Sequence, residues 1–92
     1  MSDKWTFLTS HAMVLLSIQK DPEIKAIDIA HEAGITERAV RAIIADLEKE
    51  NYLTKIKIGR RVKYSIKASK PLRHTKMHSV AVSRLLDLLE TK

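Results

Sequence analysis

The 92-residue chain has no cysteine, two glycines, two prolines and few aromatic residues. Without cysteine, disulfides, thiolate metal sites and cysteine nucleophiles are excluded, and a reducing cytoplasm is the expected location. Two glycines leave no glycine-rich phosphate loop, and no nucleophile, base and orienting group occur at a suggestive spacing. We therefore expect neither an enzyme nor a cofactor.

Long apolar runs are also missing. The longest sustained run, residues 12–16, is far shorter than the roughly 20 residues that cross a bilayer. The first residues lack the basic region, apolar stretch and small-residue cleavage site of a signal peptide. The protein is therefore expected to stay in the cytoplasm and to have no membrane partner.

Acidic residues are nearly absent from the second half of the chain. Residues 1–50 carry nine acidic and six basic side chains, a net charge of −3, whereas residues 51–92 carry two acidic and eleven basic, a net charge of +9. Between Glu50 and Asp87 there is no carboxylate side chain at all. A field of one sign attracts polyanions, although a basic surface kept for solubility has the same composition.

Three helices are predicted in the first half. The first is capped by Thr9 or Ser10 and covers residues 11–19, ending before the proline at position 22. The second covers residues 26–33 and ends at Gly34, where the left-handed conformation costs a glycine little. Thr36 caps the third, which extends to about Asn51. Its predicted buried stripe consists of Val40, Ile43, Ile44 and Leu47.

After residue 53 the period changes from that of a helix to that of a strand. Apolar and basic residues alternate on both sides of a turn at residues 59–61, which predicts a two-stranded hairpin. We expect an apolar inner face and a basic outer face. The predicted inner residues are Ile56, Ile58, Val62, Tyr64 and Ile66, and the predicted outer ones are Lys55, Lys57, Arg61, Lys63, Ser65 and Lys67.

A last helix is predicted over residues 77–90, after a connector that Pro71 closes. Its apolar face is wider than one small domain can easily cover, which indicates a second, dimeric surface. We divide the chain into a unit of three helices and a hairpin at 1–70 and a dimerisation helix at 71–92, both within one compact body. The residues expected at the dimer interface are Val80, Val82, Leu85, Leu86 and Leu89.

The spacing within residues 26–45 is typical of two helices that cross steeply. It combines a small Ala30, a turn glycine at Gly34 and branched apolar residues on the inner side of the following helix. Residues 28–40, DIAHEAGITERAV, resemble the helix-turn-helix of MarR/ArsR-type winged-helix regulators. Residues 7–11, 46–48, 51–53, 59–61 with Tyr64, and 71–74 extend the resemblance to short, single-domain members. Asn51 stands where such proteins usually carry glycine, and asparagine tolerates the same left-handed turn.

The resemblance implies a mainly α fold in which residues 1–70 are a winged helix-turn-helix DNA-binding domain whose helix at about 36–51 enters the major groove. Arg38 and Arg41 are the expected base readers, because a guanidinium fork fits the acceptor edge of guanine. Alternatively, they pair with Glu37 or Glu48 on a solvated face. The expected contacts of this helix with DNA come from Thr36, Glu37, Arg38, Arg41 and Ala42.

The hairpin at about 54–66 would be the wing, lying in the minor groove or along the backbone. Arg60 and Arg61 are expected in a narrow, electronegative minor groove, and the lysines on phosphates. The alternative is a solvated hairpin. The lysines expected on phosphates are Lys55, Lys57 and Lys63.

The predicted function is sequence-specific binding of double-stranded DNA by a homodimeric transcriptional regulator, most simply a repressor, at an inverted repeat. Two alternatives remain: a winged-helix module that contacts protein, and a nucleic-acid binder without sequence preference. His74 and His78 are four residues apart, which is a metal-ligand spacing, but with no cysteine and no nearby carboxylate we expect no metal site.

Overall fold

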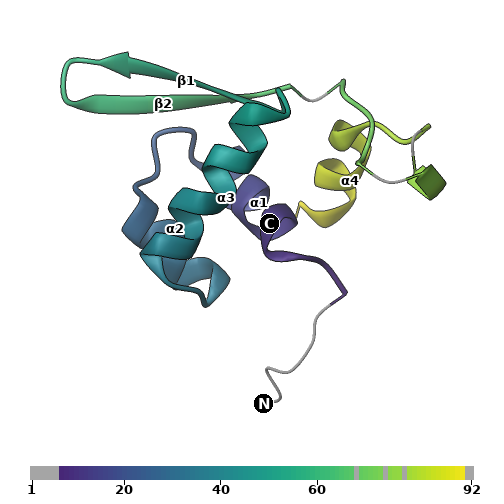
Figure 1. Ribbon diagram of the computed structural model, residues 1–92, viewed down its shortest axis with the longest axis horizontal. Coiled ribbons are helices and arrows are strands. Elements are labelled where there is room, and N and C mark those ends of the chain that lie inside the picture. The colour runs from purple at the N-terminus through teal and green to yellow at the C-terminus, as the bar shows by residue number, and fades with distance from the viewer. Residues whose placement is uncertain (1–6, 68, 74, 78, 91–92) are drawn as a thin grey trace.

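A computed structural model describes residues 7–67, 69–73, 75–77 and 79–90 (Figure 1). Three helices are followed by a two-stranded antiparallel hairpin and a C-terminal helix. This is the predicted mainly α architecture with one hairpin. The elements are α1 (Ser10–Lys20), α2 (Ala26–Ala33), α3 (Glu37–Lys49), β1 (Leu53–Ile58), β2 (Arg61–Ile66), the short 3-10 helix η1 (Thr75–Met77) and α4 (Val82–Leu89).

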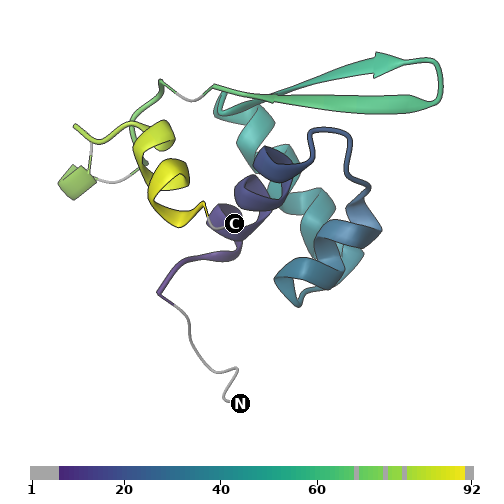
Figure 2. The ribbon, with the colours of Figure 1, turned by 180° about the vertical axis from the view of Figure 1, so that it is seen from behind.

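The core lies where α1, α2 and α3 meet, with the base of the hairpin and α4 closing its remaining sides (Figures 1 and 2). Val14 of α1, Ile29 of α2 and Val40 of α3 are completely buried there. The predicted buried stripe of α3 is confirmed, since Val40, Ile43, Ile44 and Leu47 all lie in this core. No helix within the described ranges is long and apolar enough to span a membrane.

Local signals set the angle between α2 and α3. Gly34 has φ +72°, and its amide donates to the carbonyl of Ala30 at 2.9 Å, as does the amide of Ile35 at 3.1 Å. The Thr36 hydroxyl oxygen then accepts a hydrogen bond from the amide of Ala39 at 3.0 Å, which caps α3. After α3, Asn51 adopts φ 64°, the left-handed turn expected there. The predicted glycine stop, threonine cap and asparagine turn are all confirmed.

The hairpin faces differ from the prediction. Residues directly opposite each other in an antiparallel pair share a face, and the register places Lys55 opposite Tyr64 and Ile56 opposite Lys63. One face therefore carries Leu53, Lys55, Lys57, Val62, Tyr64 and Ile66, and the other carries Thr54, Ile56, Ile58, Arg61, Lys63 and Ser65.

The prediction that Ile56 and Ile58 lie on the inner face, and Lys55 and Lys57 on the outer face, is therefore wrong. Ile56 and Ile58 are 53% and 61% exposed, whereas Val62, Tyr64 and Ile66 are half-buried. Leu53 is the β1 residue that enters the core. Because side chains alternate between the two faces of a strand, Ile56 and Ile58 lie on the face opposite Leu53, and therefore opposite the apolar residues of β2. Periodicity within each strand could not reveal this phase.

The C-terminal segment is also less helical than predicted. In place of one helix over 77–90 there is a 3-10 turn at Thr75–Met77, an extended stretch, and α4 from Val82. The extended stretch pairs with residues 70–72: the amide of Leu72 donates to Val80 and that of Val82 donates to Lys70. Ala81, between these two valines, has an extended backbone, and the pairing satisfies the carbonyl of Val80 and the amide of Val82.

Candidate nucleic-acid interface

The exposed side of α3 is the face opposite its buried stripe. Thr36, Arg38, Arg41 and Ala42 are exposed and Glu37 is half-buried, so the residues predicted to read DNA do share an accessible surface. The helix begins at a capped turn, and its axis is fixed by four buried side chains. The side chains at its N-terminal end are therefore presented on a rigid element.

The two arginines of α3 have different surroundings. A terminal nitrogen of Arg41 lies 2.5 Å from Glu37 Oε2, one turn earlier on the same helix. This is the pairing that the solvated-face alternative predicted for Arg41. Arg38 is exposed and forms no hydrogen bond or ion pair with any residue that the structure describes. Arg38 is thus the guanidinium on α3 that is available without breaking an existing pair.

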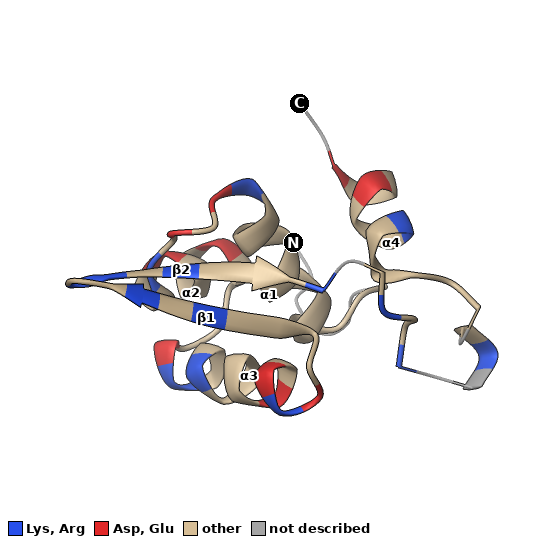
Figure 3. Ribbon diagram, turned by 90° about the horizontal axis from the view of Figure 1, so that it is seen from above, with Lys and Arg blue, Asp and Glu red and all other residues tan. Residues whose placement is uncertain are grey.

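Acidic side chains gather toward the other end of α3. Asp46 Oδ2 lies 2.9 Å from His11 Nε2 at the start of α1, and Glu48 and Glu50 follow at the end of the helix. Arg38 and Arg41 therefore occupy the half of α3 that begins at Thr36, while acids predominate in the half that leads to the hairpin (Figure 3). Only the first half of the helix is suited to a polyanion.

The hairpin places lysines on the side that faces α3. Lys55 and Lys57 share a face with Tyr64, and Tyr64 lies close enough to α3 for Glu48 and Arg41 to act on its ionisation. Burial, followed by the charge of Glu48, raises the pKa of the Tyr64 phenol, while Arg41 lowers it. Both lysines are exposed. Lys55 and Lys57 therefore lie on the hairpin face that is turned toward Arg41 of α3, and not on the outer face that the sequence predicted for them.

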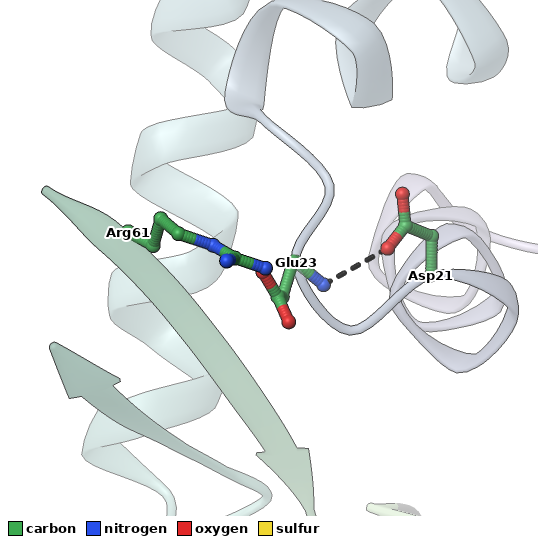
Figure 4. Close-up of polar contacts among 3 residues, drawn as sticks. All are labelled: Asp21, Glu23 and Arg61. Atoms are coloured by element: carbon green, nitrogen blue, oxygen red, sulfur yellow. Dashed lines mark hydrogen bonds and ion pairs between the residues drawn. The ribbon is translucent and has the colours of Figure 1, made fainter. Parts of the chain in front are cut away.

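The opposite hairpin face carries Arg61 and Lys63 together with the two exposed isoleucines. Arg60 is exposed at the turn and has no hydrogen-bond or ion-pair partner within the described part of the chain. Arg61, by contrast, binds the carboxylate of Glu23 in the loop between α1 and α2 (Figure 4). The two adjacent wing arginines are therefore not equivalent.

The predicted dimer residues fall into two groups. Val82 and Leu86 are each 1% exposed and belong to the core of the single chain, so they have no surface left to bury against a partner. Val80, Leu85 and Leu89 are half-buried. Leu88, which was not among the predicted interface residues, is 80% exposed.

No group of three or more metal-ligating side chains occurs among the described residues. His74 and His78, whose spacing was considered above, lie outside the described residues. His11 and His31 are exposed on α1 and α2, and His11 is paired with Asp46.

Comparison with known proteins supports the fold. Residues 10–54 match a family model described as winged helix-turn-helix DNA-binding, a match that covers α1 to α3 and the start of β1. No curated protein matches the chain. The structure of a mutant of Lactococcus lactis ZitR is similar, with a TM-score of 0.50 and 18% identity over 96% of this chain.

This chain spans only 64% of the ZitR chain, and at 18% identity the likeness concerns the fold alone. The narrower resemblance to MarR/ArsR regulators stays a prediction. The element order, the antiparallel hairpin and the family match agree with one another. The chain therefore carries a winged helix-turn-helix domain, of the kind that the matched family model describes as DNA-binding.

Proposed function

We propose that the protein binds double-stranded DNA sequence-specifically as a transcriptional regulator, with α3 in the major groove. One observation carries the proposal: Arg38 and Arg41 are exposed on α3, and Arg41 lies near Tyr64, which shares its hairpin face with Lys55 and Lys57. A helix with base-reading arginines beside phosphate-binding lysines is the arrangement that groove binding requires.

In this proposal the residues of α3 have separate tasks. Arg38 is free to offer two donors to a guanine edge, whereas Arg41 must first exchange Glu37 for DNA. The Thr36 hydroxyl accepts from the Ala39 amide and keeps its own proton to donate to a phosphate. Ala42 lies exposed on the next turn, where a methyl group can contact a thymine methyl.

The lysines of the hairpin supply affinity without reading sequence, because an ammonium group interacts with phosphate as a point charge. Lys55, Lys57 and Lys63 are all exposed. Arg60 at the turn is the cation placed to enter the minor groove. Each phosphate contact should add to the salt dependence of binding, since it releases condensed counterions.

We further propose a homodimer that binds an inverted repeat, with half-sites about 34 Å apart, and acts in the cytoplasm, most simply as a repressor. Leu88 and the half-buried Leu85 and Leu89 remain as apolar surface on α4 after folding. Leu89 also lines a shallow groove with Met13 and Leu16 of α1. Sedimentation of the intact chain at micromolar concentration tests this: a dimer that Leu88→Lys dissociates is expected, and a monomeric wild type would exclude it.

Selection of bound duplexes from a random pool tests the main proposal. Recovery of a palindromic consensus is expected, with discrimination lost in Arg38→Ala. Enrichment of duplexes without any consensus would instead favour a nonspecific binder. Absence of salt-dependent binding to any duplex would favour a winged-helix module that contacts an acidic protein.

A further inference from the structure

The loop between α1 and α2 lies along the outer edge of β2. The amide of Tyr64 donates to the carbonyl of Pro22 at 2.8 Å, outside the hydrogen bonding between β1 and β2. This bond joins the middle of the wing to the segment that leads into α2. The loop therefore contacts the hairpin as a short third strand would.

A side-chain contact lies three positions further toward the tip, at Arg61. Arg61 Nε donates to Glu23 Oε1 at 2.8 Å, and a terminal nitrogen of the same guanidinium contacts the same oxygen (Figure 4). The backbone of Glu23 is itself held in place. Its amide donates to Asp21 Oδ1 at 3.1 Å, and the next residue, Ile24, is buried in the core.

These two contacts matter because the outer hairpin has no core of its own. In β1 every residue after Leu53 is exposed, and no residue of β2 is fully buried. An isolated two-stranded hairpin is marginally stable in water, and its direction is poorly fixed. The loop at Pro22 and Glu23 thus offers the outer wing an attachment beyond the base of the hairpin.

We propose that Arg61 is a positioning residue: by binding Glu23 it fixes the wing against the loop that precedes α2, and it leaves Arg60 as the tip cation for DNA. The pair sets the direction of Lys55, Lys57 and Arg60 relative to α3. This revises the expectation that both wing arginines enter the minor groove. The DNA-binding consequence rests on the proposed function, whereas the attachment of the wing does not.

Amide hydrogen exchange of the DNA-free protein tests the attachment directly, with the Tyr64 amide as the reporter. Glu23→Gln and Arg61→Gln should each accelerate exchange at Tyr64 by a factor of about two to five, the range that exposed ion pairs contribute. The double variant should add nothing further. Arg60→Gln is the matched control and should leave the exchange rate of the Tyr64 amide unchanged. High salt should raise the wild-type exchange rate toward that of the variants, because salt screens an exposed ion pair.

Rescue by charge exchange separates an ion pair from a general structural role. Glu23→Arg combined with Arg61→Glu should restore slow exchange at Tyr64, because the pair is re-formed with its signs reversed. The proposal is overturned if Tyr64 exchange is the same in Glu23→Gln as in the wild type, or if the exchanged pair protects no better than either single change.

Duplex binding then tests the consequence for function. If Arg61 positions the wing, Glu23→Gln weakens duplex binding, and Arg61→Gln weakens it to a similar degree. The salt slope, meaning the slope of log affinity against log salt concentration, should be unchanged in Arg61→Gln. Arg60→Gln should reduce that slope by about 0.9, the value for one phosphate contact. Tighter binding by Glu23→Gln, or a reduced slope in Arg61→Gln, would show that Arg61 itself contacts DNA. If no variant, nor the wild type, binds a duplex, the proposed function fails while the exchange experiment still decides the attachment.

Discussion

The guanidinium of Arg41 lies 2.5 Å from the carboxylate of Glu37, one turn earlier on the exposed face of α3. Glu37 is also in the first turn of the helix, where a negative charge meets the positive end of the helix dipole. One carboxylate thus stabilises the helix and occupies a guanidinium that the proposed function assigns to DNA. Removing the charge of Glu37 should therefore lower the free energy of unfolding and raise the affinity for DNA.

Replacing Glu37 with Gln should raise duplex affinity about twofold, since an exposed i,i+4 pair is worth about 0.3–0.5 kcal/mol. The same change should lower the free energy of unfolding by about 0.3–1 kcal/mol through the helix dipole. Fluorescence anisotropy and urea titration measure the two effects. Asp87→Asn on α4 removes an equal charge outside the proposed interface and is the control. Weaker binding by Glu37→Gln would indicate that the carboxylate itself contacts a base.

Arg38→Ala should reduce discrimination at one base pair of the selected site by about 1–3 kcal/mol, because a bidentate contact to a guanine edge is lost. Competition binding with single-base variants of the site measures this. Lys49→Ala, at the far end of α3, should leave discrimination intact. An equal loss of affinity for every duplex in Arg38→Ala would assign Arg38 to phosphate.

Thr36→Ala should destabilise the fold by about 0.5–2 kcal/mol, because the Ala39 amide loses the hydroxyl oxygen that caps it. Chemical denaturation gives the value. Thr36→Ser keeps the hydroxyl and should retain most of the stability. If serine proves as destabilising as alanine, the threonine methyl group and not the cap is responsible.

Tyr64 gives the folded state a pH dependence above its ordinary pKa of 10.0. Burial, then the charge of Glu48, raises the pKa of the phenol in the folded state. At a pH between the pKa of the unfolded state and that of the folded state, the folded protein therefore still holds a proton that the unfolded chain has lost. Stability is therefore full below pH 10 and falls as the pH rises through the folded pKa. Unfolding measured from pH 8 to 11.5 should show this fall, and Tyr64→Phe should flatten it. An identical decline in both proteins would assign the effect to other groups.

The sequence by itself determined the helix-turn-helix. Gly34, Thr36 and Asn51 act through the backbone within a few residues of themselves, and the stripe from Val40 to Leu47 follows from helical spacing alone. Such local signals do not depend on what the rest of the chain does. The exposed positions of α3 followed from the same spacing.

The tertiary structure decided the rest, because those features depend on contacts between distant segments. Which face of the hairpin carries Ile56 and which carries Lys55 follows from the cross-strand register, and alternation within one strand leaves that phase open. The pairing of Arg61 with Glu23 joins residues 38 positions apart. The burial of Val82 and Leu86 in the chain's own core likewise depends on α4 packing against α1, a contact that periodicity could not distinguish from one with a second chain.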